Sequence, residues 1–424
     1  MKKTVLLLCM VLMMTACSKR AVKPIEGKCD CPTVEKVVTE EQPIQLPNNE
    51  APVVTQTEAT SIKVTPTKSA VKVPQYGYLA PADWQDLDGL LQDDLIAAWP
   101  AWIQSCTRLV KKTQWKPACE AAVAVKKPNN AIIIDYLSSY FDVYRAQNED
   151  GSTSGLITGY YQPLLKGSRK QSAQYPYPLY REPKDLITVD LADTYPELKF
   201  KRVRGRLEGK KLVPYRTRAE IDASPSPLAG TEVFWINDII DVFFLQIQGS
   251  GVVQLENGKQ VQVGYANQNG HAYHSIGRLL IKRGELTLAQ ASMRGIKNWA
   301  RKHLDQLQAL LNSNPSYVFF RELPAGLPGP LGALGVPIKA QRTVAVDPRF
   351  IPLGAPVFLS TTAPNSTKPL KQLMLAQDTG GAIKGGVRAD FFWGAGHKAG
   401  AKAGAMKQQG KIWVLLPKGF KLPD

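Results

Sequence analysis

Aromatic residues are absent from Lys19 to Gln75, a tract rich in Pro, Thr, Val, Lys and Glu. Such a segment cannot bury a core, so we expect it to be a disordered tether. A flexible coil of this length spans on the order of 40 Å on average. The folded body is expected to begin near Tyr76. The chain of 424 residues is long enough for two or three domains.

Histidine is scarce, with four residues in the chain, and no cysteine arrangement fits a thiol nucleophile or a zinc site. His271 and His274 have the spacing of one helical face but no carboxylate companion, so we interpret them as structural or surface residues. The GAIKGG stretch lacks both the Walker spacing and its Lys-Ser/Thr ending, which excludes a phosphate loop. We therefore expect neither a metal nor a cofactor.

The N-terminus reads MKKTVLLLCMVLMMTAC, in which Lys2 and Lys3 precede an apolar run too short to span a membrane. The small residues before Cys17 resemble a bacterial lipobox. We expect residues 1–16 to be a signal peptide and residues 17–75 to be a lipidated N-terminus with its tether. The alternative is an ordinary signal peptide with an incidental cysteine. Ser18 stands where an aspartate would indicate inner-membrane retention, which favours an outer-membrane lipoprotein facing the periplasm.

The net charge is +17, and loss of Lys2 and Lys3 leaves +15 because residues 1–16 contain no acids. A strongly basic secreted protein indicates an anionic partner, here peptidoglycan or lipid headgroups. Nucleic acid is not expected in that compartment. The alternative is that the charge serves solubility alone.

Of the six cysteines, Cys9 would leave with the signal peptide. Cys106 and Cys119 are thirteen residues apart, and we predict a disulfide bond between them because the periplasm permits it. Cys29 and Cys31 are too close to pair easily, and their partners stay open.

Hydrophobic periodicity predicts both helices and strands. Helices are expected over 84–99 with an interruption at Pro100, over 132–146, and over 275–311 with a break at Gly284. Strand-like runs dominate the rest: TEVFWIND, the long stretch DVFFLQIQGSGVVQLENGKQVQVGYANQNG, and the C-terminal RTVAVDP, APVFLST, KQLMLAQD, VRADFFWG and GKIWVLLP. Short C-terminal strands separated by glycine and proline are typical of a closed barrel.

Several long phrases occur in a fixed order between Leu156 and Pro417. They are TGYYQP, FFLQIQGSG, VGYANQNGHAYHSIGRLL, NPSYVFFRE, GALGVPIKAQRTVAVDPRFIPLGAPVFL and QDTGGAIKGGVRADFFWGAG. Together they closely resemble the membrane-bound lytic murein transglycosylase A family, including its C-terminal 3D module, which is named for three aspartates.

This resemblance implies a mainly β protein with helices. A discontinuous double-psi β-barrel would be formed by residues 76–162 and 318–424, with a second β-rich domain, residues 163–317, inserted between them. The glycan strand would lie in the groove between the domains. The family cleaves the MurNAc–GlcNAc β-1,4 bond and leaves a 1,6-anhydromuramoyl end. By motif, Asp390 is the acid and base, Asp378 the nearby helper, and Asp347 the third aspartate, which we interpret as structural.

The residues themselves fit this chemistry. Breaking a glycosidic bond needs an acid and a nucleophile. A transglycosylase takes its nucleophile from the muramoyl C6 hydroxyl, so one acid/base suffices. To hold a proton, Asp390 requires burial or a like charge. Phe391, Phe392 and Trp393 are expected to supply the apolar setting and Asp378 the charge. Arg388 opposes this if it shares the strand face of Asp390; alternatively, it binds substrate.

Sugar sites usually combine aromatic rings with planar amides. We predict that substrate is bound by Thr158, Gly159, Tyr160, Gln246, Gln248, Ser250, Lys384, Arg388 and Trp393. Gln246 and Gln248 flank Ile247 on one face of a predicted strand, and Gln246 is preferred.

Three rival functions stay open. DTG at residues 378–380 is the tripeptide of aspartic proteases, but polar Gln377 precedes it and no second DTG exists. A true hydrolase would use both Asp378 and Asp390. A non-catalytic wall-binding lipoprotein would need neither. Other cell-wall enzymes are further candidate partners, and the sequence does not distinguish exo from endo action.

Overall fold

The computed structural model describes residues 75–422. The expected signal peptide, Cys17, Cys29, Cys31 and nearly all of the expected tether lie outside the described residues. Within residues 75–422, no helix has the length and apolar character needed to cross a membrane.

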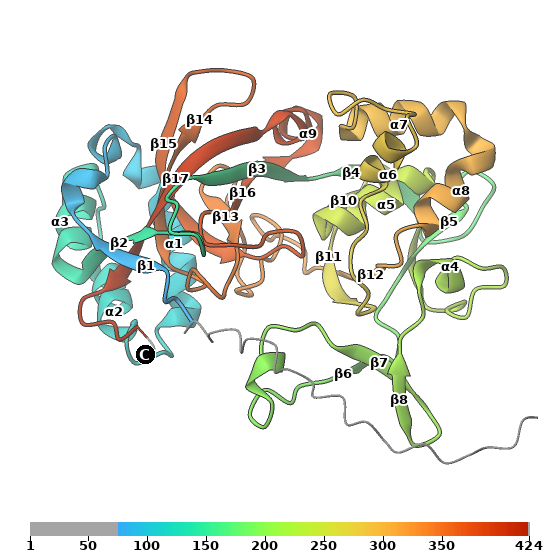
Figure 1. The fold of residues 1–424 in the computed structure, drawn as a ribbon, viewed down its shortest axis with the longest axis horizontal. Coiled ribbons are helices and arrows are strands. Elements are labelled where there is room, and N and C mark those ends of the chain that lie inside the picture. The colour runs from blue at the N-terminus through green and yellow to red at the C-terminus, as the bar shows by residue number, and fades with distance from the viewer. Residues whose placement is uncertain (1–74, 423–424) are drawn as a thin grey trace, which may run out of the picture. The chain divides into compact units, whose positions relative to one another are not determined.

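Six strands form a closed ring, so the C-terminal strands do build a barrel. In ring order they are β17 (Lys407–Pro417), β14 (Pro356–Thr362), β15 (Pro369–Asp378), β13 (Thr343–Val346), β16 (Ala389–Ala395) and β3 (Gly155–Gln162), which pairs again with β17. Two pairings are parallel, β13 with β15 and β16 with β3. Figure 1 shows green β3 beside the red and orange strands, although some 200 residues of chain separate them.

The long strand β17 changes partners along its length. Its first residues pair with β3, and its last residues pair with β2 (Phe141–Ala146), which in turn pairs with β1 (Leu79–Ala82). Side chains on both faces of these strands, such as Val344, Phe358 and Leu415, are fully buried in the main core. The ring therefore has no open edge at which another strand could add.

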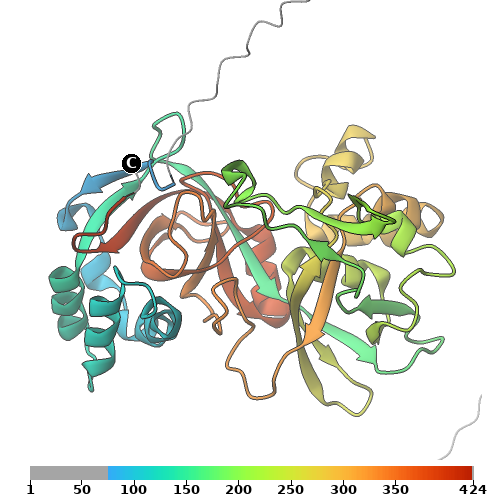
Figure 2. The ribbon, with the colours of Figure 1, turned by 90° about the horizontal axis from the view of Figure 1, so that it is seen from below.

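Helices cover one side of the barrel. They are α1 (Leu95–Leu109), α2 (Lys116–Ala124) and α3 (Asn130–Tyr140), seen in blue and teal in Figure 2, while α9 (Gly396–Ala405) packs on β3 and β16. A disulfide bond between Cys106 and Cys119 joins α1 to α2. The aromatic residues Trp102, Trp115 and Phe141 pack together beneath these helices.

Two helix predictions were wrong in their limits. The segment expected as a helix over 84–99 begins with two 3-10 turns, Trp84–Asp86 and Leu90–Gln92, because Gly89 has a φ of +97°. The helix α1 starts only after Asp94, whose side chain accepts a hydrogen bond from the N–H of Ala97 (3.2 Å), and it runs through Pro100. The helix expected over 132–146 ends at Tyr140, where β2 begins.

A second sheet of six strands follows β3 along the chain. Its order is β12 (Val318–Glu322), β11 (Gln260–Gln268), β10 (Ser250–Gln254), β4 (Leu164–Ser168), β9 (Glu232–Ile236) and β5 (Tyr177–Tyr180). The strand β12 pairs with β11, so it belongs to this sheet although it follows the domain boundary expected at residue 317.

The helices of this part of the chain pack partly against the second sheet and partly on one another. They are α4 (Arg218–Ile221), α5 (Ile239–Gln248), α6 (Ile276–Lys282), α7 (Met293–Lys302) and α8 (Leu304–Asn312). The break predicted at Gly284 occurs, with a φ of +75°, but the next helix starts only at Met293 and a further break at His303 separates α7 from α8. The strand expected from residue 241 was wrong as far as residue 248, because residues 241–248 belong to α5.

A three-stranded sheet lies within the same part of the chain. It consists of β6 (Ile187–Thr188), β7 (Arg204–Glu208) and β8 (Lys211–Pro214), and the segment between β6 and β7 carries the 3-10 turn Pro196–Leu198. We call residues 187–214 the arm; several of its large apolar side chains, such as Tyr195 and Phe200, are exposed.

Candidate active site

Strand register aligns the two aspartates of the C-terminal segment. On β13, Ala345 pairs with Asp378 of β15 on one side and with Asp390 of β16 on the other. Asp390 in turn pairs with Thr158 of β3. Directly paired residues project to the same face of a sheet, and strands are about 4.8 Å apart. The two carboxylates therefore share one face with a single strand between them.

Asp390 is bonded through only one of its oxygens. Its Oδ1 accepts a hydrogen bond from Oγ1 of Thr158 (2.6 Å), and Oδ2 has no partner among residues 75–422. Burial raises the pKa of Asp390 to about 6. The Thr158 hydrogen bond and the charge of Arg388 lower this pKa, whereas the charge of Asp378 raises it further. Burial outweighs the arginine, so Asp390 can hold a proton in mildly acidic solution.

Arg388 acts on Asp390 through Thr158. Its Nη2 donates to Oγ1 of Thr158 (2.9 Å), and its Nη1 donates to the backbone oxygens of Ala389 (2.6 Å) and Leu156 (3.3 Å). The hydroxyl of Thr158 must accept from the guanidinium, so its own proton points to Asp390. Arg388 thus fixes the direction of the Thr158 hydrogen bond.

Asp378 has both oxygens occupied. Its Oδ2 accepts from the hydroxyl of Tyr160 (3.0 Å), and its Oδ1 accepts from the backbone N–H groups of Thr379 (2.9 Å) and Ala333 (3.0 Å). Burial raises the pKa of Asp378, and these three hydrogen bonds oppose that rise. Ala333 was not singled out from the sequence, although it lies in the quoted phrase GALGVPIKAQ. A hydrogen bond donated by a backbone N–H does not depend on the type of side chain, so the sequence gives no signal for it.

The apolar surroundings of the pair come from a small cluster. Tyr160, Ala345 and Phe392 pack with Ile338 and Ile383, and the rings of Tyr160 and Phe392 are 5.0 Å apart. This cluster limits the access of water to the half-buried aspartates, and burial is the largest influence on both pKa values.

Sequence and structure comparisons point to one family. Residues 156–321 match the MltA specific insert domain and residues 342–416 match the 3D domain. The chain is 32% identical over 282 residues to the membrane-bound lytic murein transglycosylase A of Escherichia coli (strain K12), covering 65% of this chain and 69% of that protein. The chain belongs to the membrane-bound lytic murein transglycosylase A (MltA) family of enzymes.

Solved structures agree with the MltA assignment. The MltA of Neisseria gonorrhoeae in its monoclinic form is 35% identical, with a TM-score of 0.70, over 81% of this chain and 93% of that one. The E. coli MltA crystallised with bound chitohexaose is 27% identical, with a TM-score of 0.57, over 80% of this chain and 91% of that one. The mainly β fold with helices is thus shared with MltA relatives.

Not all residues expected to bind substrate in this MltA member lie at the aspartate pair. Trp393 projects into the main core with Phe391, on the opposite face of β16 from Asp390 and Phe392. Its Nε1 donates to Sδ of Met406 (3.3 Å), and Lys402 lies over its ring. Trp393 therefore packs the barrel, and of the three expected aromatic residues only Phe392 borders the carboxylates.

Gly159 has a packing role. A Cβ at this position would lie 2.8 Å from the ring of Trp393 and 2.9 Å from Cα of Ala403. Any side chain at residue 159 would push α9 away from β3, so the glycine is explained without substrate.

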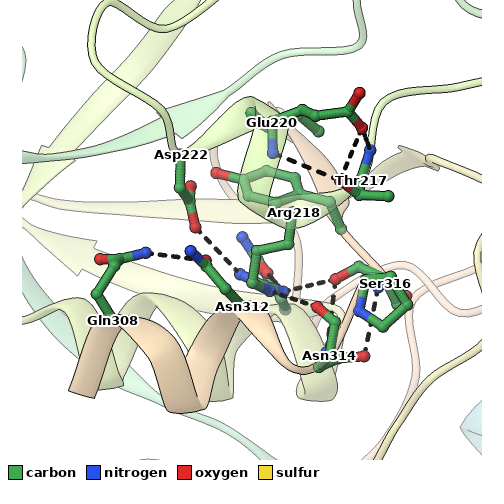
Figure 3. Close-up of polar contacts among 12 residues, drawn as sticks. Thr217, Arg218, Glu220, Asp222, Gln308, Asn312, Asn314 and Ser316 are labelled. Carbon is green, nitrogen blue, oxygen red and sulfur yellow. Dashed lines mark hydrogen bonds and ion pairs between the residues drawn. The ribbon is translucent and has the colours of Figure 1, made fainter. Parts of the chain in front are cut away.

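The side chains of Gln246 and Gln248 have different partners because the two residues lie on a helix and not on one face of a strand. Gln246 is buried, and its Oε1 accepts from Nη2 of Arg218. Figure 3 shows Arg218 with Asn314 and Ser316, whose backbone oxygens accept from its Nε (3.1 Å) and Nη2 (2.7 Å), and with Asp222. Arg218 is 3% exposed, so this network holds together α4, α5 and the segment between α8 and β12. Gln246 thus has a role within the fold, and substrate binding by it stays a prediction.

Gln248, at the end of α5, faces the chain that leaves the barrel. Its Oε1 accepts from the backbone N–H of Tyr161 in β3 (3.0 Å). Ser250 is buried at the start of β10, while Lys384 is exposed on the loop between β15 and β16. Of the predicted binding residues, the structure brings Thr158, Tyr160 and Arg388 into the hydrogen-bond network of the aspartates.

Asp347 lies apart from this network. The Nε–H of Arg349 donates to both of its oxygens (3.0 and 3.1 Å) and Nη2 of the same residue to Oδ2 (2.6 Å). The backbone N–H groups of Arg349 (3.2 Å) and Gly385 (3.0 Å) also donate to the carboxylate. Although burial works in the other direction, these bonds lower the pKa of Asp347. No cluster of histidine, cysteine and carboxylate side chains among residues 75–422 could hold a metal ion.

Proposed function

We propose that this member of the MltA family is a lytic transglycosylase that cleaves the MurNAc–GlcNAc β-1,4 bond of peptidoglycan and leaves a 1,6-anhydromuramoyl end. The observation that carries the proposal is the setting of Asp390. Burial raises its pKa to about 6, and one of its oxygens is free of protein partners among the described residues. A general acid works best when its pKa is near the working pH.

Asp390 performs both proton transfers in this mechanism. Its protonated carboxyl donates to the glycosidic oxygen as the bond from that oxygen to muramoyl C1 breaks. The C6 hydroxyl then attacks C1 and gives its proton to the Asp390 carboxylate, which restores the acid. One bond to C1 is exchanged for another, and no water is consumed.

The hydrogen-bond network supports this single-residue scheme. Thr158 donates to Oδ1, so the transferable proton resides on Oδ2, the oxygen without a protein partner among residues 75–422. Asp378 cannot readily serve as a second base that activates water, because three donors occupy its two oxygens. This favours transglycosylation over the two-carboxylate hydrolase.

The substrate class has further support from a relative. E. coli MltA was crystallised with chitohexaose, a β-1,4-linked chain of N-acetylglucosamine. Glycan binding by this chain is proposed on that likeness.

The proposal extends to the architecture. We assign the ring of six strands as a double-psi barrel, built from residues 76–162 and a C-terminal part, with the second sheet as an inserted domain. The second boundary moves from residue 317 to residue 322 because β12 pairs in the second sheet. The glycan would lie in a groove between the two domains.

We further propose that Cys17 carries lipid and anchors the enzyme to the periplasmic face of the outer membrane. Lipidation adds about 0.8 kcal/mol per buried methylene. Cys17→Ala is expected to release the protein into the soluble periplasm with its fold intact. Fractionation of that variant with outer membranes in high salt would contradict the anchor.

Digestion of purified peptidoglycan followed by mass spectrometry tests the activity. Anhydro products are one water lighter than reducing ends, so their masses separate a transglycosylase from a hydrolase. Reducing ends alone would contradict the mechanism, and no products would contradict an enzyme acting on this substrate.

A further inference from the structure

Basic side chains from two distant parts of the sequence meet at the loop that follows Asp378. Nη1 of Arg202 in the arm lies 3.2 Å from the point that a Cβ on Gly381 would occupy. Gly381 is three residues after Asp378, and Lys384 follows on the same loop. Lys201 precedes Arg202, and all three cationic side chains are exposed. We call Lys201, Arg202 and Lys384 the basic cluster.

The cluster has no acidic counterpart. None of its members forms an ion pair or a side-chain hydrogen bond with another of the described residues 75–422. The acid whose charge reaches Lys384 is Asp347, which is already bonded to Arg349 and to the N–H of Gly385. Partial burial lowers the pKa of Lys384, and the charges of Arg202, Arg349 and Lys201 lower it further. Converging cations that outnumber the nearby acid create a positive potential that attracts anions.

Chitohexaose, the ligand of the E. coli relative, carries no charge, so a cationic surface has no partner on the sugar rings themselves. Peptidoglycan differs from that ligand at its muramoyl residues, whose lactyl branch ends in a carboxylate or in a peptide that carries carboxylates. Arginine binds carboxylates in a planar, two-point manner, and lysine adds a mobile point charge.

We propose that Lys201, Arg202 and Lys384 bind a carboxylate on the muramoyl branch of the substrate, so that the arm recognises the substituent while the barrel acts on the glycan. This inference rests on the proposed function, because it assumes that the muramoyl residue lies at Asp390. The distance in sequence between Arg202 and Gly381 explains why the cluster cannot be found from motifs.

The test compares the double variant Lys201→Gln, Arg202→Gln with a matched control, Lys210→Gln, Lys211→Gln. Both lose two charges from the arm, but Lys210 and Lys211 lie at the turn between β7 and β8. Each enzyme is assayed on glycan strands that keep their peptides and on strands stripped by an amidase, which carry the free lactyl carboxylate. Binding of neutral chitohexaose is measured alongside, and Lys384→Gln serves as an independent variant.

The cluster variant is expected to raise KM about 5- to 10-fold, as for two partly exposed charge contacts, with kcat within twofold. If KM rises only on peptide-bearing strands, the cluster binds the peptide carboxylates. If KM rises only on stripped strands, it binds the lactyl carboxylate. A raised KM on both strand types means that the cluster binds either carboxylate. The control variant and chitohexaose binding should stay within twofold of wild type.

Two results would overturn the proposal: unchanged KM on both strand types, or equally weakened binding of chitohexaose. Failure of the proposed function is a separate outcome, because it shows as absence of anhydro products from the wild-type enzyme. A wild type that makes these products beside an unaffected cluster variant would reject only the carboxylate site.

Discussion

The start of β16 and the turn after β13 hold carboxylates in opposite settings within one barrel. At the turn, Asp347 has a fully bonded carboxylate that is 1% exposed, and its pKa is lowered. At β16, Asp390 has one bonded oxygen, and burial raises its pKa to about 6. Each aspartate is preceded in the sequence by buried residues of a short strand, so residue type and local pattern do not distinguish the two. The number of hydrogen-bond donors around each carboxylate distinguishes them.

The largest effect should come from Asp390→Asn. Under the proposed mechanism this change removes the transferable proton while keeping the shape of the side chain, so kcat is expected to fall by about 10⁴-fold or more, the upper end for general acid–base catalysis. Chitohexaose affinity should stay near that of wild type. The measurement is anhydro-muropeptide formation by mass spectrometry together with a binding titration, and turnover within tenfold of wild type would remove Asp390 from the mechanism.

Asp378→Asn should have a smaller effect, a loss of roughly 10- to 100-fold, since it tunes and orients the acid without transferring a proton. The charge of Asp378 raises the pKa of Asp390, so its removal lowers that pKa. Because the acid must be protonated, the decline of kcat/KM with rising pH should move to lower pH. An Asp378→Asn enzyme as inactive as Asp390→Asn would mean that both carboxylates carry protons.

The contributions of Asp347 and Asp390 to the free energy of unfolding should change with pH in opposite directions. The pKa of Asp347 is lowered, so its contribution exists above the unfolded pKa of about 4 and disappears as pH falls through the native value. Asp347→Asn is expected to destabilise by roughly 1–3 kcal/mol at pH 7 and by less near pH 3.

The pKa of Asp390 is raised, so the native state binds its proton more tightly than the unfolded state, and stability declines as pH rises from about 4 to about 6. Asp390→Asn should therefore stabilise by roughly 1–3 kcal/mol at pH 7 and by nothing near pH 4. Urea unfolding of the two variants at both pH values measures this, and shifts of equal sign would refute the contrast.

The smallest effect is expected from Thr158→Val. Loss of its hydrogen bond raises the pKa of Asp390, so the decline of kcat/KM at high pH should move upward by about one unit or less. Thr158→Ser keeps the hydroxyl and should behave as wild type. A downward shift in Thr158→Val would instead mean that Arg388 reaches Asp390 directly once the threonine is gone.

Much of the barrel could be predicted because its strands are short apolar runs bounded by glycine and proline. The C-terminal strands expected from RTVAVDP to GKIWVLLP all occur. What could not be predicted is the register that pairs Ala345 with both Asp378 and Asp390, since a parallel pairing between β13 and β15 leaves no local signal. The motif therefore predicts that the two aspartates lie near each other but not the strand register that brings them to one face.

The error at α5 has a physical origin. Its residues are rich in phenylalanine, valine and isoleucine, which favour strands, and short apolar runs fit a helix or a strand equally. The helix signals were present at the ends: Asp238 accepts from the N–H groups of Ile240 and Asp241, and Gly249 has a φ of +77°. The burial of Gln246 depends on Arg218, which is 28 residues away, so no local pattern could show it.

The closure of the ring by β3 bears on how the protein is made. Thr158 and Asp390 are 232 residues apart in the chain, and the whole second sheet is synthesised between them. Contacts between such distant segments form late in folding, because a long loop must close first. A chain that stops before β16 has neither its acid nor the parallel partner of β3. Under the proposed function, the ability to cut the cell wall thus arises only when the last part of the protein is complete.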